Sequence, residues 1–184
     1  MDWAILVAAA FCAFAFMAHL WSVAAVIMRC KRAISPRPIV RPAVTVLRPV
    51  CGLENFVEET LASTFRLGGT YEIVFCVASG NDPVVPLVRE LIARYPAIPA
   101  RLLIGDDPIS QNPKLNNVAK GWAAASFDWI AMVDSNVLMT PDSISRLFAN
   151  CCDDTGIVCS PPVGAAPSGW GAELECAFLN TYQA

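Results

Sequence analysis

Three charged side chains stand where they could hold a phosphorylated ligand: Asp82, Lys114 and Asp134. Asp134 directly follows the apolar run 129–133 and opens the sequence DSN. A single carboxylate is enough to hold Mg²⁺ or Mn²⁺ against a diphosphate, because phosphate oxygens and waters complete the coordination of these ions. The alternative for Asp134 is an Asx turn after a strand, and the alternative for Asp82 is an ordinary N-cap before Pro83.

The segment NPKLNN, residues 112–117, predicts the start of a helix. Asn112 is a favoured N-cap residue and Pro113 suits the first helical position. The first turn of a helix carries unpaired N–H groups and the positive end of the macrodipole, so a cation there is unfavourable by about 0.3–1 kcal/mol. Lys114 in this turn therefore indicates a site for an anion. A solvated lysine on a capped surface helix is the alternative.

The rest of the chain alternates apolar runs with amphipathic segments. Strands alternating with helices predict an α/β fold, a mostly parallel sheet with helices on both faces. Strands are expected at 44–47, 71–78, 101–104, 129–133 and 156–160, and helices near 54–67, from 82 to 95, from 112, and at 141–150 with Thr140 as its cap.

The candidate residues all follow predicted strands. In an open α/β sheet, ligands bind at the carboxyl ends of the strands. We expect that edge to receive the loops 48–54, 79–82, 105–116 and 134–136, together with Ser160. This convergence favours the ligand-binding interpretation of Lys114 over the solvated one.

Several classes of site are excluded by missing motifs. GxGxxG and GxxxxGK[ST] are both absent, which argues against dinucleotide-binding and P-loop proteins. The 8 cysteines form no CxxC pair and His19 is the only histidine, so neither a zinc site nor a disulfide framework is expected. No nucleic-acid partner is expected for a chain of net charge -3.

The N-terminal segment predicts a membrane anchor. Residues 3–28 contain no Asp, Glu, Lys or Arg, and as a helix they would span about 39 Å, more than the roughly 30 Å of a bilayer's hydrocarbon core. A cleaved signal peptide would have a basic start and a shorter apolar region. The basic, Pro-rich linker 29–43 follows, and its positive charges place the domain 44–184 in the cytoplasm, with a single pass through the membrane.

Five segments in order, RPVCGLEN, CVASGNDP, NPKLNN, DWIAMVDSN and GIVCSPPVG, resemble the ceramide glucosyltransferases of glycosyltransferase family 21, the bacterial members above all. The resemblance covers essentially residues 1–184. It implies a GT-A fold and a transferase that moves glucose from UDP-glucose to the primary hydroxyl of ceramide, with inversion, at the cytoplasmic membrane face. It also implies that Asp82 and Asp134 are the first two of three aspartates important for activity.

The resemblance assigns roles to six residues. Asp134 would hold the metal ion and act with Lys114 on the diphosphate, while the nucleotide sugar would contact Asp82, Glu54, Asn116 and Asn117. DSN lacks the second carboxylate of a DxD motif, and the family's third aspartate and (Q/R)xxRW motif would lie beyond Ala184, so we expect the N-terminal part of a longer enzyme. Two alternatives stay open: a family-2 transferase for another lipid, such as a hopanoid or polyprenyl phosphate, and an inactive nucleotide-sugar-binding membrane protein.

Overall fold

The computed structural model describes residues 3–31, 42–149, 151–152 and 154–182. The chain divides into two compact units. One unit comprises Met1–Pro36 and Cys159–Ala184, and the other comprises Arg37–Val158. Most of the predicted linker, residues 32–41, lies outside the described residues.

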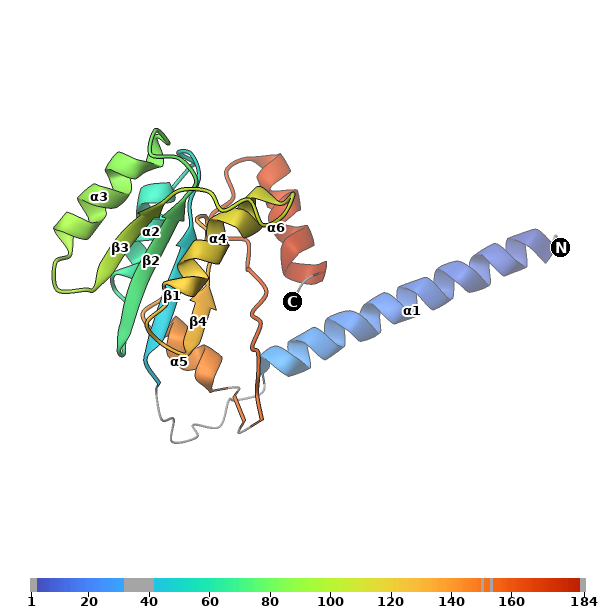
Figure 1. The fold of residues 1–184 in the computed structure, drawn as a ribbon. Coiled ribbons are helices and arrows are strands. Elements are labelled where there is room, and N and C mark those ends of the chain that lie inside the picture. Colours follow the sequence, from blue (N-terminus) through green and yellow to red (C-terminus); the bar gives the residue numbers. More distant parts are fainter. Residues whose placement is uncertain (1–2, 32–41, 150, 153, 183–184) are drawn as a thin grey trace. The chain divides into compact units, whose positions relative to one another are not determined.

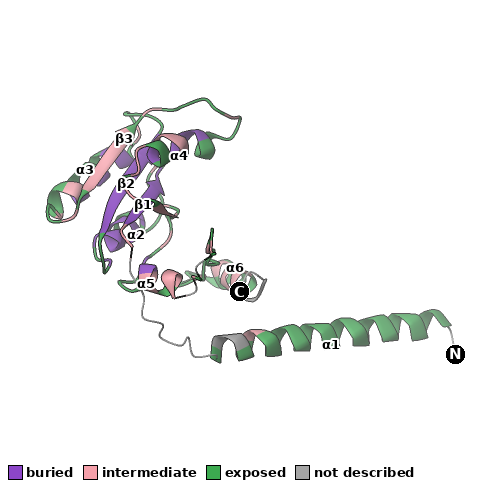
Figure 2. Cartoon of the chain, turned by 60° about the horizontal axis from the view of Figure 1, so that its bottom comes forward, coloured by how far each residue is buried: buried purple, intermediate pink, exposed green. Residues whose placement is uncertain are grey.

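The larger unit is built on a parallel sheet of four strands, β1 (Val44–Pro49), β2 (Tyr71–Val77), β3 (Ala100–Ile104) and β4 (Trp129–Met132). The strand order is β3-β2-β1-β4, so β1 lies between β2 and β4 (Figure 1). Val44 pairs with Tyr71 on one side and with Trp129 on the other. Every residue of β1 and β2 is buried, as expected for central parallel strands covered on both faces (Figure 2).

Helices cover both faces of this sheet. One face packs a large apolar core that includes Leu61 of α2 (Val57–Thr64), Val88 of α3 (Val84–Arg94) and Ile144 of α5 (Ser143–Phe148). The opposite face packs Leu47 and Val74 against Val118 of α4 (Pro113–Ala123). The predicted fold, a parallel sheet with helices on both sides, is confirmed.

Gly121 allows α4 to lie close to the sheet. A Cβ atom at this position would collide with Leu47 Cδ1 and Cys76 Sγ, which belong to β1 and β2. Because Gly121 has no side chain, α4 can pack directly against the two central strands.

The prediction of a fifth strand at 156–160 is wrong. These residues pair with no strand, and Ile157 is 80% exposed. Pro161 and Pro162 follow directly and have no N–H to donate to a ladder. The run also crosses the boundary between the two units, so Ser160 belongs to the smaller unit. The cap predicted for the helix 141–150 is wrong as well: α5 begins later, and its N-cap position is Asp142 rather than Thr140.

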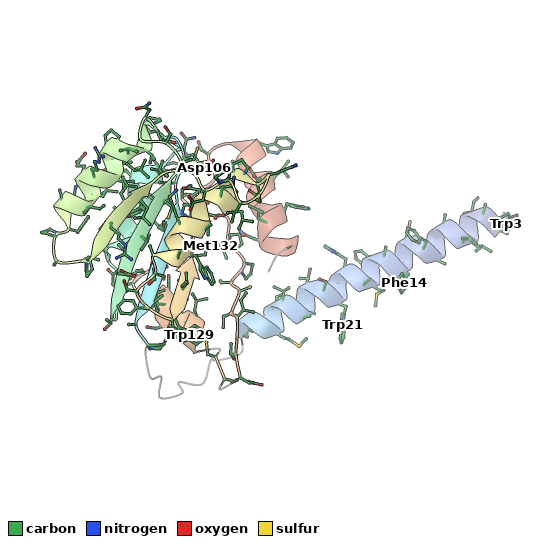
Figure 3. The ribbon with its side chains drawn as sticks, viewed as in Figure 1. Trp3, Phe14, Trp21, Asp106, Trp129 and Met132 are labelled. Carbon is green, nitrogen blue, oxygen red and sulfur yellow. The ribbon has the colours of Figure 1, made fainter. Side chains whose placement is uncertain are left out.

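The smaller unit contains α1 (Trp3–Lys31) and α6 (Trp170–Tyr182). Within α1, Trp3–Met28 is long and apolar enough to cross a membrane, and none of that window is buried. Trp3, Phe14 and Trp21 project from it (Figure 3). Near α6, Asn180 accepts a hydrogen bond from the Gly164 N–H at 2.7 Å and donates one to the Gly164 carbonyl at 3.1 Å.

Glu72 forms a buried polar cluster at the sheet end opposite to the candidate site. Its carboxylate accepts hydrogen bonds from Thr45 Oγ1 at 2.7 Å and from Ser126 N at 2.7 Å, and it pairs with Arg101 at 3.1 Å. Burial raises the pKa of Glu72, but these hydrogen bonds and the Arg101 charge outweigh that effect and hold the pKa below its usual value. The charged form of Glu72 therefore stabilises the fold.

We expect Glu72→Gln to lower the free energy of unfolding by about 1–3 kcal/mol at pH 7, because it removes a charged partner from buried donors. Since the folded pKa lies below the unfolded one, the contribution of Glu72 is complete above about pH 4.5 and disappears as the pH falls through the folded pKa. Denaturant unfolding in detergent from pH 3 to 7 measures this. The exposed Glu90, paired with Arg94, is the control, and Glu90→Gln should change stability by less than about 1 kcal/mol. Parallel pH profiles for wild type and Glu72→Gln would contradict this role.

Candidate functional site

Lys114 and Asp134 meet at the carboxyl edge of the sheet. Lys114 Nζ lies 2.5 Å from Asp134 Oδ1, and the two side chains are 54% and 52% exposed. Asp134 comes two residues after Met132, which ends β4 (Figure 3), and Lys114 is in the first turn of α4. Two residues predicted to share a ligand therefore lie in contact, half open to solvent.

The first turn of α4 is fixed as its sequence predicts. Asn112 is the N-cap, with extended backbone, and its side-chain oxygen accepts hydrogen bonds from Lys114 N at 3.0 Å and Leu115 N at 3.4 Å. Pro113 occupies the first helical position. This capping holds the Lys114 backbone and leaves its side chain to pair with Asp134.

Asn116 and Asn117 are buried and already bonded within the protein. Asn116 accepts from Ser110 N at 2.9 Å and donates to Ser110 O at 3.1 Å, which holds the loop before α4. Asn117 donates to the carbonyl of Cys76 at 2.8 Å, near the end of β2. These contacts hold the loop and the helix at the edge, and the contact of both amides with a nucleotide sugar stays a prediction.

Asp82 joins two neighbouring loops. Its carboxylate accepts hydrogen bonds from Gly52 N at 2.9 Å and from Val84 N at 2.9 Å. It therefore bonds to the first N–H of α3 and also holds the loop after β1, although the N-cap position of α3 is Pro83 and not Asp82. Burial raises the pKa of the Cys51 thiol in this loop, and the adjacent Asp82 charge adds to the shift.

Glu54 connects the same loop to the Asp134 segment. Ser135 Oγ donates to Glu54 Oε2 at 3.5 Å; Glu54 is exposed and Ser135 is half-buried. The contacts of Asp82 with Gly52 and of Glu54 with Ser135 thus link the loops after β2, β1 and β4 into one continuous edge.

Two cations at this edge were missed by the sequence analysis. Arg48, the second-to-last residue of β1, is fully buried. Its Nη2 donates to the carbonyls of Asp134 at 2.7 Å, Ser135 at 3.1 Å and Val137 at 3.0 Å. Burial lowers the pKa of Arg48 to about 10, and the Asp134 charge opposes this shift. A basic residue inside the apolar strand VTVLRP was the available signal.

Lys120 is the second of these cations. Its Nζ donates to the carbonyl of Val77 at 3.1 Å, to the carbonyl of Gly105, and to Asn117 Oδ1 at 2.6 Å. Burial lowers its pKa, and the charges of Asp106 and Asp107 are among those that oppose the shift. Lys120 therefore holds the ends of β2 and β3 together, whereas Lys114 on the same helix faces the half-open edge.

The described residues contain no group of three His, Cys, Asp or Glu side chains that could enclose a metal ion. Asp134 is a half-exposed carboxylate with a cation on one oxygen. That donor set fits a Mg²⁺ or Mn²⁺ ion held by one carboxylate together with ligand phosphates and waters, which is the usual manner for Mg²⁺. It does not fit an ion that needs a complete protein cage.

The chain is similar in sequence to known ceramide glucosyltransferases. The ceramide glucosyltransferase of Komagataella phaffii is 40% identical over 121 residues, which cover 63% of this chain and 24% of that protein. Ceramide glucosyltransferase 1 of Caenorhabditis elegans is 30% identical over 172 residues, covering 92% of this chain and 37% of that protein. The chain thus spans about a quarter to somewhat over a third of the length of these relatives.

A solved structure supports the fold. A mannosyltransferase from Pyrobaculum calidifontis, in complex with GDP-Man and Mn²⁺, aligns with a TM-score of 0.56 at 20% sequence identity, covering 75% of this chain and 42% of that one. The predicted GT-A type of fold is thereby confirmed. The family model described as glycosyl transferase family 21 matches residues 5–184. The chain therefore belongs to glycosyl transferase family 21.

Proposed function

We propose that this chain forms the nucleotide-sugar site of an enzyme that transfers glucose from UDP-glucose to the primary hydroxyl of ceramide, with inversion at the sugar. The observation that carries this proposal is the half-exposed contact of Lys114 with Asp134 at the carboxyl edge of the sheet. The names of the relatives support the acceptor, and the GDP-Man and Mn²⁺ of the mannosyltransferase support a nucleotide sugar and a divalent ion in general.

The chemistry follows from where charge develops. As the bond between the sugar and UDP breaks, negative charge grows on the diphosphate, and a fixed cation there lowers the barrier. Lys114 can exchange the Asp134 oxygen for a phosphate oxygen without moving its capped backbone. A Mg²⁺ or Mn²⁺ ion on the released Asp134 carboxylate would neutralise the same diphosphate. Glu54, which is exposed, would contact the nucleoside, and Asp82 holds the Glu54 loop through the Gly52 N–H.

The acceptor explains why the chain carries α1. Ceramide leaves a bilayer at a cost of about 0.8 kcal/mol per exposed CH₂, so the reaction must take place at the membrane surface. Trp3–Met28 would anchor the protein there. Arg29, Lys31 and the basic residues after them would keep the transferase domain on the cytoplasmic side.

An assay of full-length purified protein in detergent, with UDP-[¹⁴C]glucose, ceramide and Mn²⁺, tests this function. We expect radiolabelled glucosylceramide and released UDP, both lost on addition of EDTA and restored by Mn²⁺, because the single Asp134 carboxylate holds the ion weakly enough to be stripped. UDP binding without turnover would instead identify a nucleotide-sugar-binding protein. Transfer to polyprenyl phosphate or a hopanoid but not to ceramide would identify a different lipid acceptor. Absence of both binding and turnover would refute the proposal.

A further inference from the structure

The Asp134 turn is held from inside the protein by one guanidinium group. Residues 134–137 form a tight turn in which Val137 N donates to Asp134 O at 3.2 Å. Three carbonyls of this turn accept from the same nitrogen, Arg48 Nη2. The backbone of the turn therefore faces the core, while the Asp134 carboxylate faces Lys114 and solvent.

The same guanidinium is itself fixed on its other side. Arg48 Nη1 donates to Thr64 Oγ1 at 2.6 Å and to Thr60 O at 3.2 Å, both in α2. Thr60 Oγ1 also donates directly to Ser135 O at 2.6 Å. Helix α2, the buried Arg48 and the turn 134–137 thus form one hydrogen-bonded network. This network fixes the backbone that carries the Asp134 carboxylate.

We propose that Arg48 is a positioning residue for the nucleotide site, which holds Asp134 in the orientation needed to bind a metal–diphosphate. This inference rests on the role proposed above for Asp134. Residues that bond to a ligating group from behind typically change metal affinity by about 10- to 100-fold when they are replaced.

The geometry requires arginine. Nη1 and Nη2 point in different directions and reach α2 and the turn at the same time. A lysine carries its three donors on a single nitrogen and cannot reproduce a planar fork. With a pKa of about 10, Arg48 stays charged at neutral pH, so its positive charge also lies beneath the Asp134 carboxylate.

The test compares Arg48→Lys with a matched variant of the same strand. Thr45→Val also removes a buried hydrogen bond from β1, to Glu72 at 2.7 Å, but at the opposite end of the sheet. Full-length protein in detergent is titrated with Mn²⁺ in the presence of UDP, followed by the Mn²⁺ EPR signal. In parallel, hydrogen exchange measures the protection of the Val137 amide, and denaturant unfolding measures stability.

We expect Arg48→Lys to weaken Mn²⁺·UDP binding by about 10- to 100-fold and to expose the Val137 amide, whereas Thr45→Val loses stability without either change. Thr64→Val keeps the guanidinium group of Arg48 and removes one of its hydrogen-bond partners. It should therefore lower both the Mn²⁺·UDP affinity and the Val137 amide protection, but by less than Arg48→Lys. This second variant keeps the test valid if Arg48→Lys fails to fold.

Unchanged affinity and unchanged Val137 protection in a folded Arg48→Lys protein would overturn the role of Arg48. A loosened turn in a protein whose wild type binds no Mn²⁺·UDP would support Arg48 as the clamp of this turn and refute the nucleotide site itself. The two failures are therefore distinguishable.

Discussion

Lys114→Ala is expected to lower UDP-glucose turnover by about 10²- to 10³-fold, the usual loss when one preorganised donor to a developing anion is removed. Lys114 Nζ is the cation at the half-open edge beside Asp134, while Arg48 and Lys120 are committed to backbone carbonyls. The loss should fall mainly on kcat, since the charge on the diphosphate is greatest in the transition state. Steady-state kinetics with varied UDP-glucose would measure it.

The fold should not change in this variant. The Lys114 side chain is 54% exposed, and the helix cap uses only its backbone N–H. Arg89→Ala removes an exposed cation from α3 and serves as the matched control, with turnover expected to equal that of the wild type. Lys114→Arg should restore part of the activity because it restores the charge. Wild-type turnover in Lys114→Ala would show that this lysine is a solvated surface residue.

Gly121→Ala is expected to lower the free energy of unfolding by about 1–3 kcal/mol, the range for added volume in a packed core. The new methyl group would overlap Leu47 Cδ1 and Cys76 Sγ, and both side chains are fully buried in the two central strands. Relief would come from moving α4 outward, and α4 carries Lys114. We therefore expect turnover to fall together with stability, which denaturant unfolding and the radiolabel assay would show.

Gly171→Ala is the matched control for this substitution. Gly171 also lies in a helix, α6, but a Cβ there would meet no atom within 4 Å. Alanine has the higher helix propensity, so Gly171→Ala should leave stability unchanged or raise it slightly. If Gly121→Ala were as stable as Gly171→Ala, close packing of α4 on the sheet would not set the position of Lys114.

The sequence predicted those elements whose formation depends on neighbouring residues in the chain. The apolar runs of β1 and β2 and the Asn112-Pro113 start of α4 appear as expected. The strand at 156–160 failed because a strand needs a partner, and the apolar run alone does not show whether one is present. The helix start after Thr140 failed because Asp142 could also occupy the N-cap position.

The contacts of the candidate site likewise fall into those that the sequence could predict and those that it could not. The contact between Lys114 and Asp134 could be predicted because both follow elements whose ends meet at one edge of a parallel sheet. The basic residue in β1 was visible in the sequence, but the partners of Arg48 could not be predicted, since Thr64 and Val137 are far away in sequence. The bonding of Asn116 and Asn117 within the protein likewise depends on where Ser110 and Cys76 come to lie.

The strand order also has a kinetic consequence. Among the strands of the described residues, β4 pairs with β1 alone, and the two strands are separated in the chain by β2, β3 and three helices. Pairings of such long sequence separation form slowly, because the loop-closure entropy precedes the contacts that compensate for it. During synthesis, β1, β2 and β3 can therefore assemble while Asp134 is still inside the ribosome. A nascent chain at that stage has most of its core residues but still lacks β4 and the Asp134 carboxylate, to which the proposed site assigns the metal ion.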